Sequence, residues 1–371
     1  MVNTNILFSV WVWHLIATFE SMGFTALGYT LGPSGDVFSS RDAIQNWQGF
    51  GAFIVFVLWG IWMARRHLTH VFLSFLGRVE PDDQRELLPY RWAVPGLVAA
   101  TAYIWMYLVR LGVTHTMVAV WLFAAFIAYF GTTRMIAQTG LVYMRSPMTP
   151  PLFVLGTFGT IGVPPQALVG FVGTYSLVVN GRAPLMPGIF HMSWIGAKIG
   201  SNGRRMFTAM VIGLTVAYVV GALYIIYISY THGAETFHSA PYTVHGTSIY
   251  DDVIEKMQAR HEPDIRRVGF LGFGAAVMAL LTMLQYRFPG FPLHPIGLPI
   301  AMTWHVWMGF LPVFLAWMIK SIVLHVGGIS AYTKSRPIFI GIIAGYSVGV
   351  MLSLFVDWMW FNGAGHQIHS W

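Results

Sequence analysis

The segment MFTAMVIGLTVAYVVGALYIIYISY, residues 206–230, is predominantly apolar and contains no charged side chain. A helix crosses the hydrocarbon core of a bilayer with about 20 such residues, so this segment is long enough to span a membrane. Similar runs recur along the chain, which is 56% hydrophobic and only 9% charged. Soluble domains carry about 25% charged residues. The sequence therefore predicts an all-α protein, a polytopic bundle of transmembrane helices.

The long apolar runs predict about eight spans. They cover residues 6–29, 47–64, 92–111, 114–137, 206–230, 268–286, 300–324 and 337–361. Residues 65–91 are expected to form a cytoplasmic loop with a short interfacial helix, because cytoplasmic loops are rich in arginine and lysine. Residues 231–267 are expected to form a polar extramembrane segment with a surface helix over 249–262. We expect residues 1–371 to form a single integral membrane domain.

Two stretches interrupt this pattern. Residues 147–200 are apolar but rich in proline and glycine, so short half-helices or re-entrant hairpins are expected there. The second stretch is FPLHPIGLPI, residues 291–300, which we expect to be a rigid, non-helical lead-in to the following span, with Pro299 in its first turn. It is either a stiff loop with His294 at the membrane interface or an extended backbone that lines a cavity.

Composition and motifs exclude several functional classes. The chain has no cysteine, which excludes disulfides, thiolate catalysis and iron–sulfur clusters. It contains no HEXXH, Walker or GXSXG motif, no histidine spacing typical of haem, and no soluble domain large enough to house an enzyme. The net charge of +7 comes from arginines beside spans, a pattern typical of topology signals and anionic-lipid contact. We therefore expect no enzyme, cofactor, metal or nucleic-acid site.

Ionisable residues within spans are costly and usually functional. Arg134 is able to hold a carboxylate, since the guanidinium fork matches that group. It is equally able to pair with Glu20 or Asp357, or to extend to the interface. Glu20 and Asp357 are candidates for proton or ion coupling. The alternatives without a functional role are an interfacial loop position for Glu20, and a structural ion pair or an interfacial position for Asp357.

The interrupted stretches and these ionisable residues predict a solute site. Its members are Arg134, Gly156, Gly159, His294 and His305, in which Arg134 holds a solute carboxylate and a histidine carries a proton. The physical basis is that broken helices in transporters leave backbone groups unpaired near the bilayer midplane.

The motif RFPGFPLHPIGLPI, residues 287–300, and the stretch FLAWMIKSIVLHVGGISAYTKSRPIFIGIIAGY, residues 314–346, resemble the C-terminal part of an uncharacterised family of prokaryotic polytopic membrane proteins. That family looks like a distant branch of the oligopeptide transporter superfamily, whose members move peptides or metal chelates. The resemblance implies residence in a prokaryotic inner membrane. Two departures are that the known members are longer, and that Tyr346 stands where an acidic residue is expected.

The expected function is that of a membrane transporter or transporter half, moving a small solute that is anionic or peptide-like. The alternative is a non-transporting subunit of a larger membrane complex that contacts lipids, pigments or other chains. Expected partners are the lipid bilayer, the solute, and other membrane subunits or further copies of the chain. An intramembrane enzyme or haem protein is disfavoured by the motif search.

Overall fold

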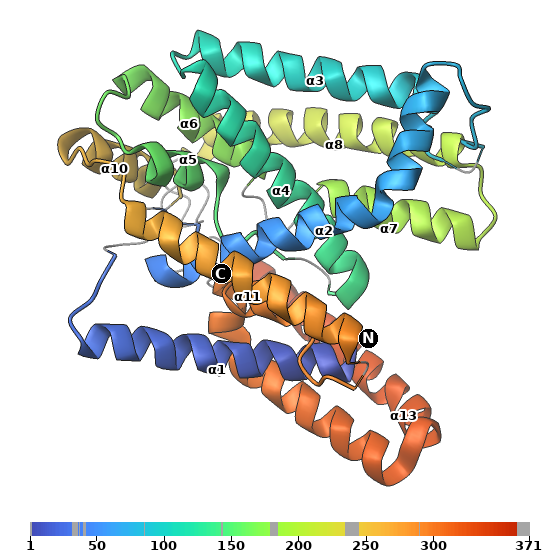
Figure 1. Cartoon of the computed structure of the whole chain (residues 1–371). Helices are drawn as coiled ribbons and strands as arrows, with labels where there is room; N and C mark the ends of the chain where they lie inside the picture. The colour runs from blue at the N-terminus through green and yellow to red at the C-terminus, as the bar shows by residue number, and fades with distance from the viewer. Residues whose placement is uncertain are drawn as a thin grey trace. The chain divides into compact units, whose positions relative to one another are not determined.

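A computed structural model describes residues 2–31, 36, 38–39, 42–84, 86–141, 144–178, 185–233, 245–288 and 290–361. These residues form twelve helices and no β-sheet (Figure 1). Seven of the helices are long and apolar enough to cross a membrane: α1 (Thr4–Ala26), α2 (Ala43–Phe75), α3 (Tyr90–Arg110), α4 (His115–Thr139), α8 (Gly203–His232), α11 (Ile265–Arg287) and α13 (Trp304–Trp360). This confirms the predicted all-α membrane bundle.

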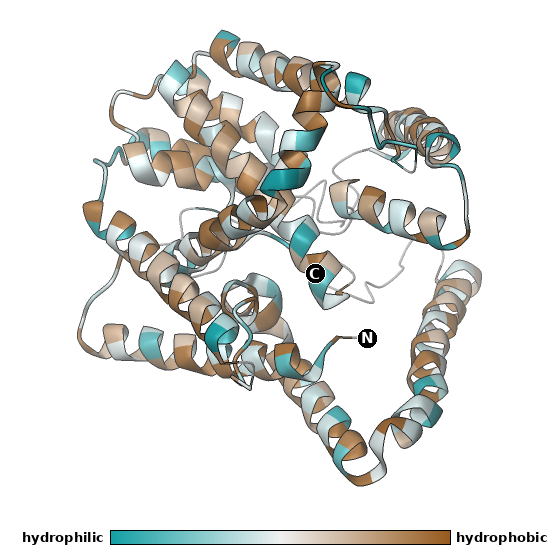
Figure 2. Cartoon of the chain, turned by 45° about the vertical axis from the view of Figure 1, so that its right-hand side comes forward, coloured by the Kyte–Doolittle hydropathy of each residue, from teal (hydrophilic) through white to brown (hydrophobic). Residues whose placement is uncertain are grey.

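The last of these helices contains two predicted spans. At about 1.5 Å per residue, the 57 residues of α13 would extend about 86 Å if straight, far more than the ~30 Å of a bilayer core. Figure 2 shows that α13 instead turns sharply on itself. Gly328 has a φ of 63°, a left-handed value that glycine adopts without strain. The predicted spans 300–324 and 337–361 largely match the two arms of this helix.

The chain forms two compact units, residues 1–313 and residues 314–371. The first unit contains the hydrophobic core and the short helices, whereas the second contains most of α13. The single membrane domain expected over 1–371 stays a prediction.

Helix α2 is longer than predicted. The predicted span ends at residue 64, before Arg65 and Arg66, whereas the helix itself continues to Phe75. Charged side chains end a membrane span but do not end a helix, and no glycine or proline lies between residues 61 and 75. The predicted interfacial helix is therefore the last part of α2, where the ribbon changes direction (Figure 1).

The proline- and glycine-rich region forms short helices, as its composition predicts. Its described residues form α5 (Pro150–Phe158), α6 (Pro165–Val178) and α7 (Leu185–Lys198). Pro150 and Pro165 stand at the first positions of their helices, where a proline removes no intrahelical hydrogen bond. The predicted surface helix is also present, as α10 (His245–Gln258), and begins a few residues earlier than expected.

The start of α8 lies beside the charged connection between α2 and α3. Arg204, at the start of α8, approaches Asp83 in the connection between α2 and α3, with 3.8 Å between the charged atoms. The start of α8 therefore lies on the side of that charged connection. Arg266, at the start of α11, is paired with Asp264 at 2.8 Å.

Helices α2 and α11 pack against each other backbone to backbone. A Cβ atom added to Gly51 would lie 1.9 Å from the carbonyl oxygen of Leu271, and one added to Gly274 would lie 2.0 Å from that of Gln48. Both distances are far below van der Waals contact, so each glycine is required for the approach. Small residues permit such approach between membrane helices, where packing replaces the hydrophobic effect as the driving force.

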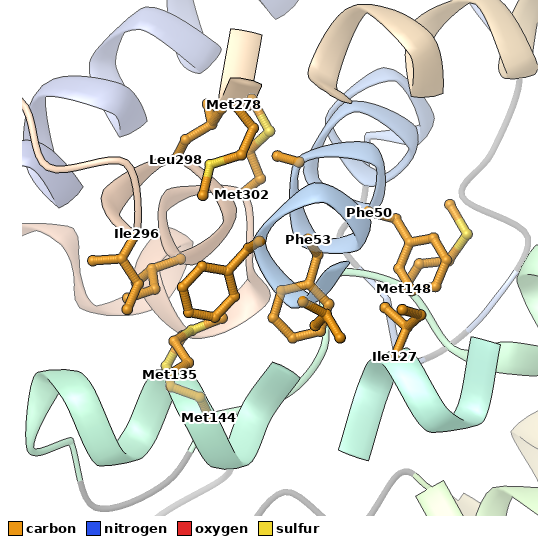
Figure 3. Close-up of a cluster of buried hydrophobic side chains, with 14 of the residues drawn as sticks. Phe50, Phe53, Ile127, Met135, Met144, Met148, Met278, Ile296, Leu298 and Met302 are labelled. Atoms are coloured by element: carbon orange, nitrogen blue, oxygen red, sulfur yellow. The ribbon is translucent and has the colours of Figure 1, made fainter. Parts of the chain in front are cut away.

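Side chains from several helices and from the 290–302 stretch pack around α2 to form the core. Figure 3 shows Phe50 and Phe53 of α2 among sulfur-containing and aliphatic side chains. The labelled members of this cluster are Phe50, Phe53, Ile127, Met135, Met144, Met148, Met278, Ile296, Leu298 and Met302. Methionine adapts to irregular gaps, which suits a core built from non-parallel elements.

The PLHPIG stretch packs against α1. Residues 290–296 are non-helical, as predicted, but the short helix α12 (Gly297–Ala301) then precedes a break at residues 302–303. Pro299 therefore lies inside α12, and the long helix begins at Trp304 instead of Ile300. A Cβ on Gly297 would lie 2.5 Å from the Cβ of Ser9, so α12 contacts α1 through two small residues.

The α2–α11 contact predicts a difference between two glycines of one helix. Gly274→Ala should destabilise the protein by about 2–3 kcal/mol, because the helices must separate to admit the methyl group. Gly272 has open space around the position of a Cβ atom. Gly272→Ala should change stability by less than about 1 kcal/mol, in the stabilising direction. Thermal unfolding in mild detergent measures both, and equal midpoints for the two variants would contradict the close contact.

Candidate functional site

A cavity of about 460 Å³ lies in the first unit, bounded by α1, α2, α4, α11 and the 290–296 stretch. Its polar lining residues are Arg134, Gln138, Thr282, Gln285, Tyr286 and His294. Its apolar lining residues are Ile6, Phe56, Trp59, Met278, Pro295 and Ile296. The volume is in the range of small-molecule sites, and a mostly apolar wall with a few convergent polar groups is typical of them.

Arg134 reaches the cavity across the surface of α2. Its guanidinium carbon lies 4.3 Å from the centre of the Phe56 ring, and its Nη1 donates a hydrogen bond to the backbone carbonyl of Phe56. A Cβ on Gly60 would lie 2.2 Å from this Nη1 atom. Because Gly60 has no side chain, the guanidinium is able to approach the backbone of α2.

The charge of Arg134 is not neutralised by a carboxylate within the described part of the chain. The ion pairs found there are Arg204–Asp83, Lys256–Asp252 and Arg266–Asp264. The predicted pairing with Glu20 does not form, because Glu20 instead accepts a hydrogen bond of 2.6 Å from Gln48. A half-buried cation in this position is suited to an anion that enters the cavity.

His294 is held in one tautomer by the backbone. Its own N–H donates to Ser9 Oγ at 2.6 Å, and its ring Nδ1 accepts from the N–H of Ile296 at 3.2 Å. A neutral ring whose Nδ1 accepts must carry its proton on Nε2. Burial lowers the pKa of His294 below its ordinary value, so the ring is neutral at pH 7. The side chain is therefore an uncharged donor at the cavity.

The cavity brings together only two of the five predicted solute-site residues, Arg134 and His294. A Cβ on Gly156 would lie 2.5 Å from the ring of Trp47, so this glycine permits close packing. Gly159 ends α5 with a φ of 73° and lies against the backbone of residues 261–263. His305 lies in the first turn of α13, outside the cavity lining.

The two predicted coupling carboxylates also lie elsewhere. Glu20, on α1, is linked to α2 through Gln48, and it does not line the cavity. Asp357 lies near the end of α13, in the second unit, and is partly exposed. Their coupling role stays a prediction.

Sequence reasoning missed the polar residues that surround Arg134. Gln138 lies four residues after Arg134 and so shares its helix face. On α11, Gln285 and Tyr286 lie three and four residues after Thr282 and so share its face. This helical spacing of polar residues is the sequence signal that could have identified them. The amides offer both donors and acceptors, so this set is able to bind a small molecule that carries a carboxylate and a polar backbone.

Comparison with known proteins places the chain in a family. A model described as "Family of unknown function (DUF6785)" matches residues 1–369, and the chain belongs to this family. No curated protein and no solved structure matches the chain.

The environment of Arg134 predicts the effect of removing its charge. Arg134→Met keeps most of the side-chain volume and loses one charge-assisted hydrogen bond of about 1.5–3 kcal/mol, which is offset because a half-buried cation is removed. The thermal midpoint in mild detergent should lie within about 3 °C of the wild-type value, or above it. A decrease as large as that caused by Gly274→Ala would show that Arg134 stabilises the fold instead of serving the cavity.

Proposed function

We propose that this family member is a membrane transporter, or half of one, and that the cavity around Arg134 binds a small anionic or peptide-like solute. The observation that carries the proposal is a cation in a cavity between candidate spans, with no carboxylate partner among the described residues. Such a group is expensive inside a membrane, which favours a functional role.

The interrupted backbone beside Arg134 supports this proposal. His294, Pro295 and Ile296 line the cavity, and they precede the short helix α12. Substrate sites of secondary transporters typically use discontinuous helices, whose unpaired backbone groups contact the solute. Residues 287–300 resemble an uncharacterised family that looks like a distant branch of the oligopeptide transporter superfamily, and this resemblance favours a peptide-like solute.

The lining residues suggest how a carboxylate would be held. Arg134 would form a bidentate pair with it. The amides of Gln138 and Gln285 would contact the rest of the solute, and neutral His294 would donate from Nε2. A second proton on His294 would have to bind Nδ1 and would break the hydrogen bond from the Ile296 N–H, so His294 serves as a neutral donor here.

Uptake into proteoliposomes tests the proposal. Amino acids, dicarboxylates, dipeptides and tripeptides are supplied to the purified chain. Arg134→Lys keeps the charge but loses the fork, so it should raise the KM for the transported solute about 10- to 100-fold. Arg134→Met should abolish uptake.

The matched control is Arg110→Met, which removes an exposed arginine at the end of α3, outside the cavity. This variant should retain wild-type uptake. Uptake by Arg134→Met at the wild-type rate would reject the proposed site.

One observation favours the second candidate function, a subunit of a larger complex. No residue in the apolar stretch of α8 is buried, and Tyr218, near the middle of this helix, is 79% exposed. A tyrosine hydroxyl that faces hydrocarbon lacks a hydrogen-bond partner, which costs about 2–7 kcal/mol. A further helix that covers this face of α8 would supply the missing partner.

Cross-linking tests this candidate, because a chain without cysteine needs no background substitutions. Tyr218→Cys, labelled with a maleimide–benzophenone and irradiated in membranes, should yield a larger covalent species, because the photoactivated benzophenone inserts into C–H bonds of any neighbouring chain. Val98→Cys, at a 63% exposed position on α3, is the control and should remain monomeric. A monomeric product from both variants would argue against a partner on α8.

A further inference from the structure

A second group of polar residues is buried away from the cavity. It gathers side chains from four segments: Asp36, between α1 and α2, Thr149, which caps α5, Tyr175 on α6, and Asp252 and Lys256 on α10. Asp36 is only 7% exposed and Lys256 only 9%. Ionisable groups are rarely buried to this extent unless they are paired.

The carboxyl group of Asp36 is hydrogen-bonded on both oxygens. Oδ2 accepts from the hydroxyl of Thr149, and Oδ1 accepts from the N–H of Phe38 at 2.6 Å. The hydroxyl of Tyr175 is also hydrogen-bonded to Asp36. Hydroxyl groups both donate and accept. Thr149 and Tyr175 are therefore able to donate to an ionised Asp36 carboxylate or to accept from a protonated one, by rotation of their O–H bonds.

Helix α10 covers this group. Val253, on α10, is 6% exposed and belongs to a hydrophobic cluster that includes residues of α5 and α6. Arg260 donates to the carbonyls of Thr160 and Val163, at 2.7 and 2.5 Å, and the N–H of His261 donates to Thr160 Oγ1 at 2.9 Å. The helix and its C-terminal extension are thus docked on the connection between α5 and α6.

We propose that Asp36 is a proton-binding site, and that proton binding there holds α10 docked on α5 and α6. This role of Asp36 requires neither transport nor the cavity around Arg134.

Charges from each surrounding element act on Asp36. Lys256 attracts its ionised form and Asp252 repels it. Lys256 itself is paired with Asp252, one turn away on α10, and Glu255 repels Asp252. Arg145, on the segment before α5, lies 5.8 Å from the ring of Phe38. A protonated Asp36 leaves the Lys256–Asp252 pair neutral, whereas an ionised Asp36 places a second carboxylate beside it.

The direction of the pH response follows from burial. Burial raises the pKa of Asp36 above its ordinary value, against the lowering effect of the hydrogen bond from Thr149. The docked state therefore binds the proton more tightly than a state in which α10 has left and water reaches the carboxyl group. This contribution is complete below the ordinary carboxyl pKa and is lost as the pH rises through the raised pKa. Above the raised pKa the contribution is absent.

Spin labels on α10 and α6 measure the docking. Cysteines are introduced at Ile254 and Val169, which are 48% and 45% exposed, and the distance distribution is recorded by double electron–electron resonance between pH 4 and pH 9. The wild-type background should give one narrow distance at low pH. A second, undocked population should grow as the pH rises, by up to about tenfold per pH unit relative to the docked one.

Two substitutions separate Asp36 from its neighbours. Asp36→Asn mimics the protonated carboxyl group and should keep α10 docked at every pH. Glu255→Gln removes an exposed carboxylate of α10 and should leave the response unchanged. A pH-independent wild-type distribution would overturn the proposal. So would a response that persists in Asp36→Asn, or one that disappears only in Asp252→Asn.

Discussion

The contact between the backbones of α2 and α11 determines how the first unit is assembled. Gly51 and Gly274 fix both the separation and the register of the two helices. Each has only a hydrogen atom as its side chain, and this side of the residue lies against a backbone carbonyl of the other helix. The register then brings Trp59 to Tyr286, whose ring centres lie 5.6 Å apart at the cavity. The cavity wall at Trp59 and Tyr286 thus lies about two turns from Gly51 and about three turns from Gly274.

The same physical rule acts at several other contacts. Gly297 meets Ser9, Gly156 meets Trp47, and Gly60 meets the guanidinium of Arg134. Lipid tails are as apolar as leucine, so helices in a membrane gain stability from close packing more than from hydrophobic burial. Glycine is the residue that permits such packing. In this chain its positions mark the places where elements distant in sequence come together.

Much of the architecture was predictable, because span length and helix interruption are local properties. The apolar runs located the long helices, and Pro150, Pro165 and the 291–300 stretch marked the interruptions correctly. Local patterns failed where two signals looked alike. A double arginine was read as the end of α2, although it ended only the apolar part. Gly156 and Gly159 were predicted to belong to a solute site, which stays a prediction; in the structure each lies at a close contact outside the cavity lining.

The candidate sites were predictable only in part, for a physical reason. Arg134 was recognisable because a charged side chain within a span is energetically costly, and His294 because it lies in the unusual proline-rich stretch 291–300. Neither Tyr286, an aromatic residue at a span end, nor Asp36, a loop carboxylate, is unusual in its local sequence. Their surroundings come from segments more than a hundred residues away, as in the hydrogen bond between Thr149 and Asp36. The spacing of residues along one segment does not predict contacts of this kind.

The open α2 backbone at Gly60 has a consequence for the evolution of the family. The guanidinium of Arg134 occupies the space that a side chain at position 60 would need. A substitution at either position therefore alters the selective constraint on the other. Relatives that carry a larger residue at position 60 should have a shorter or differently directed side chain at position 134, so the two positions should covary.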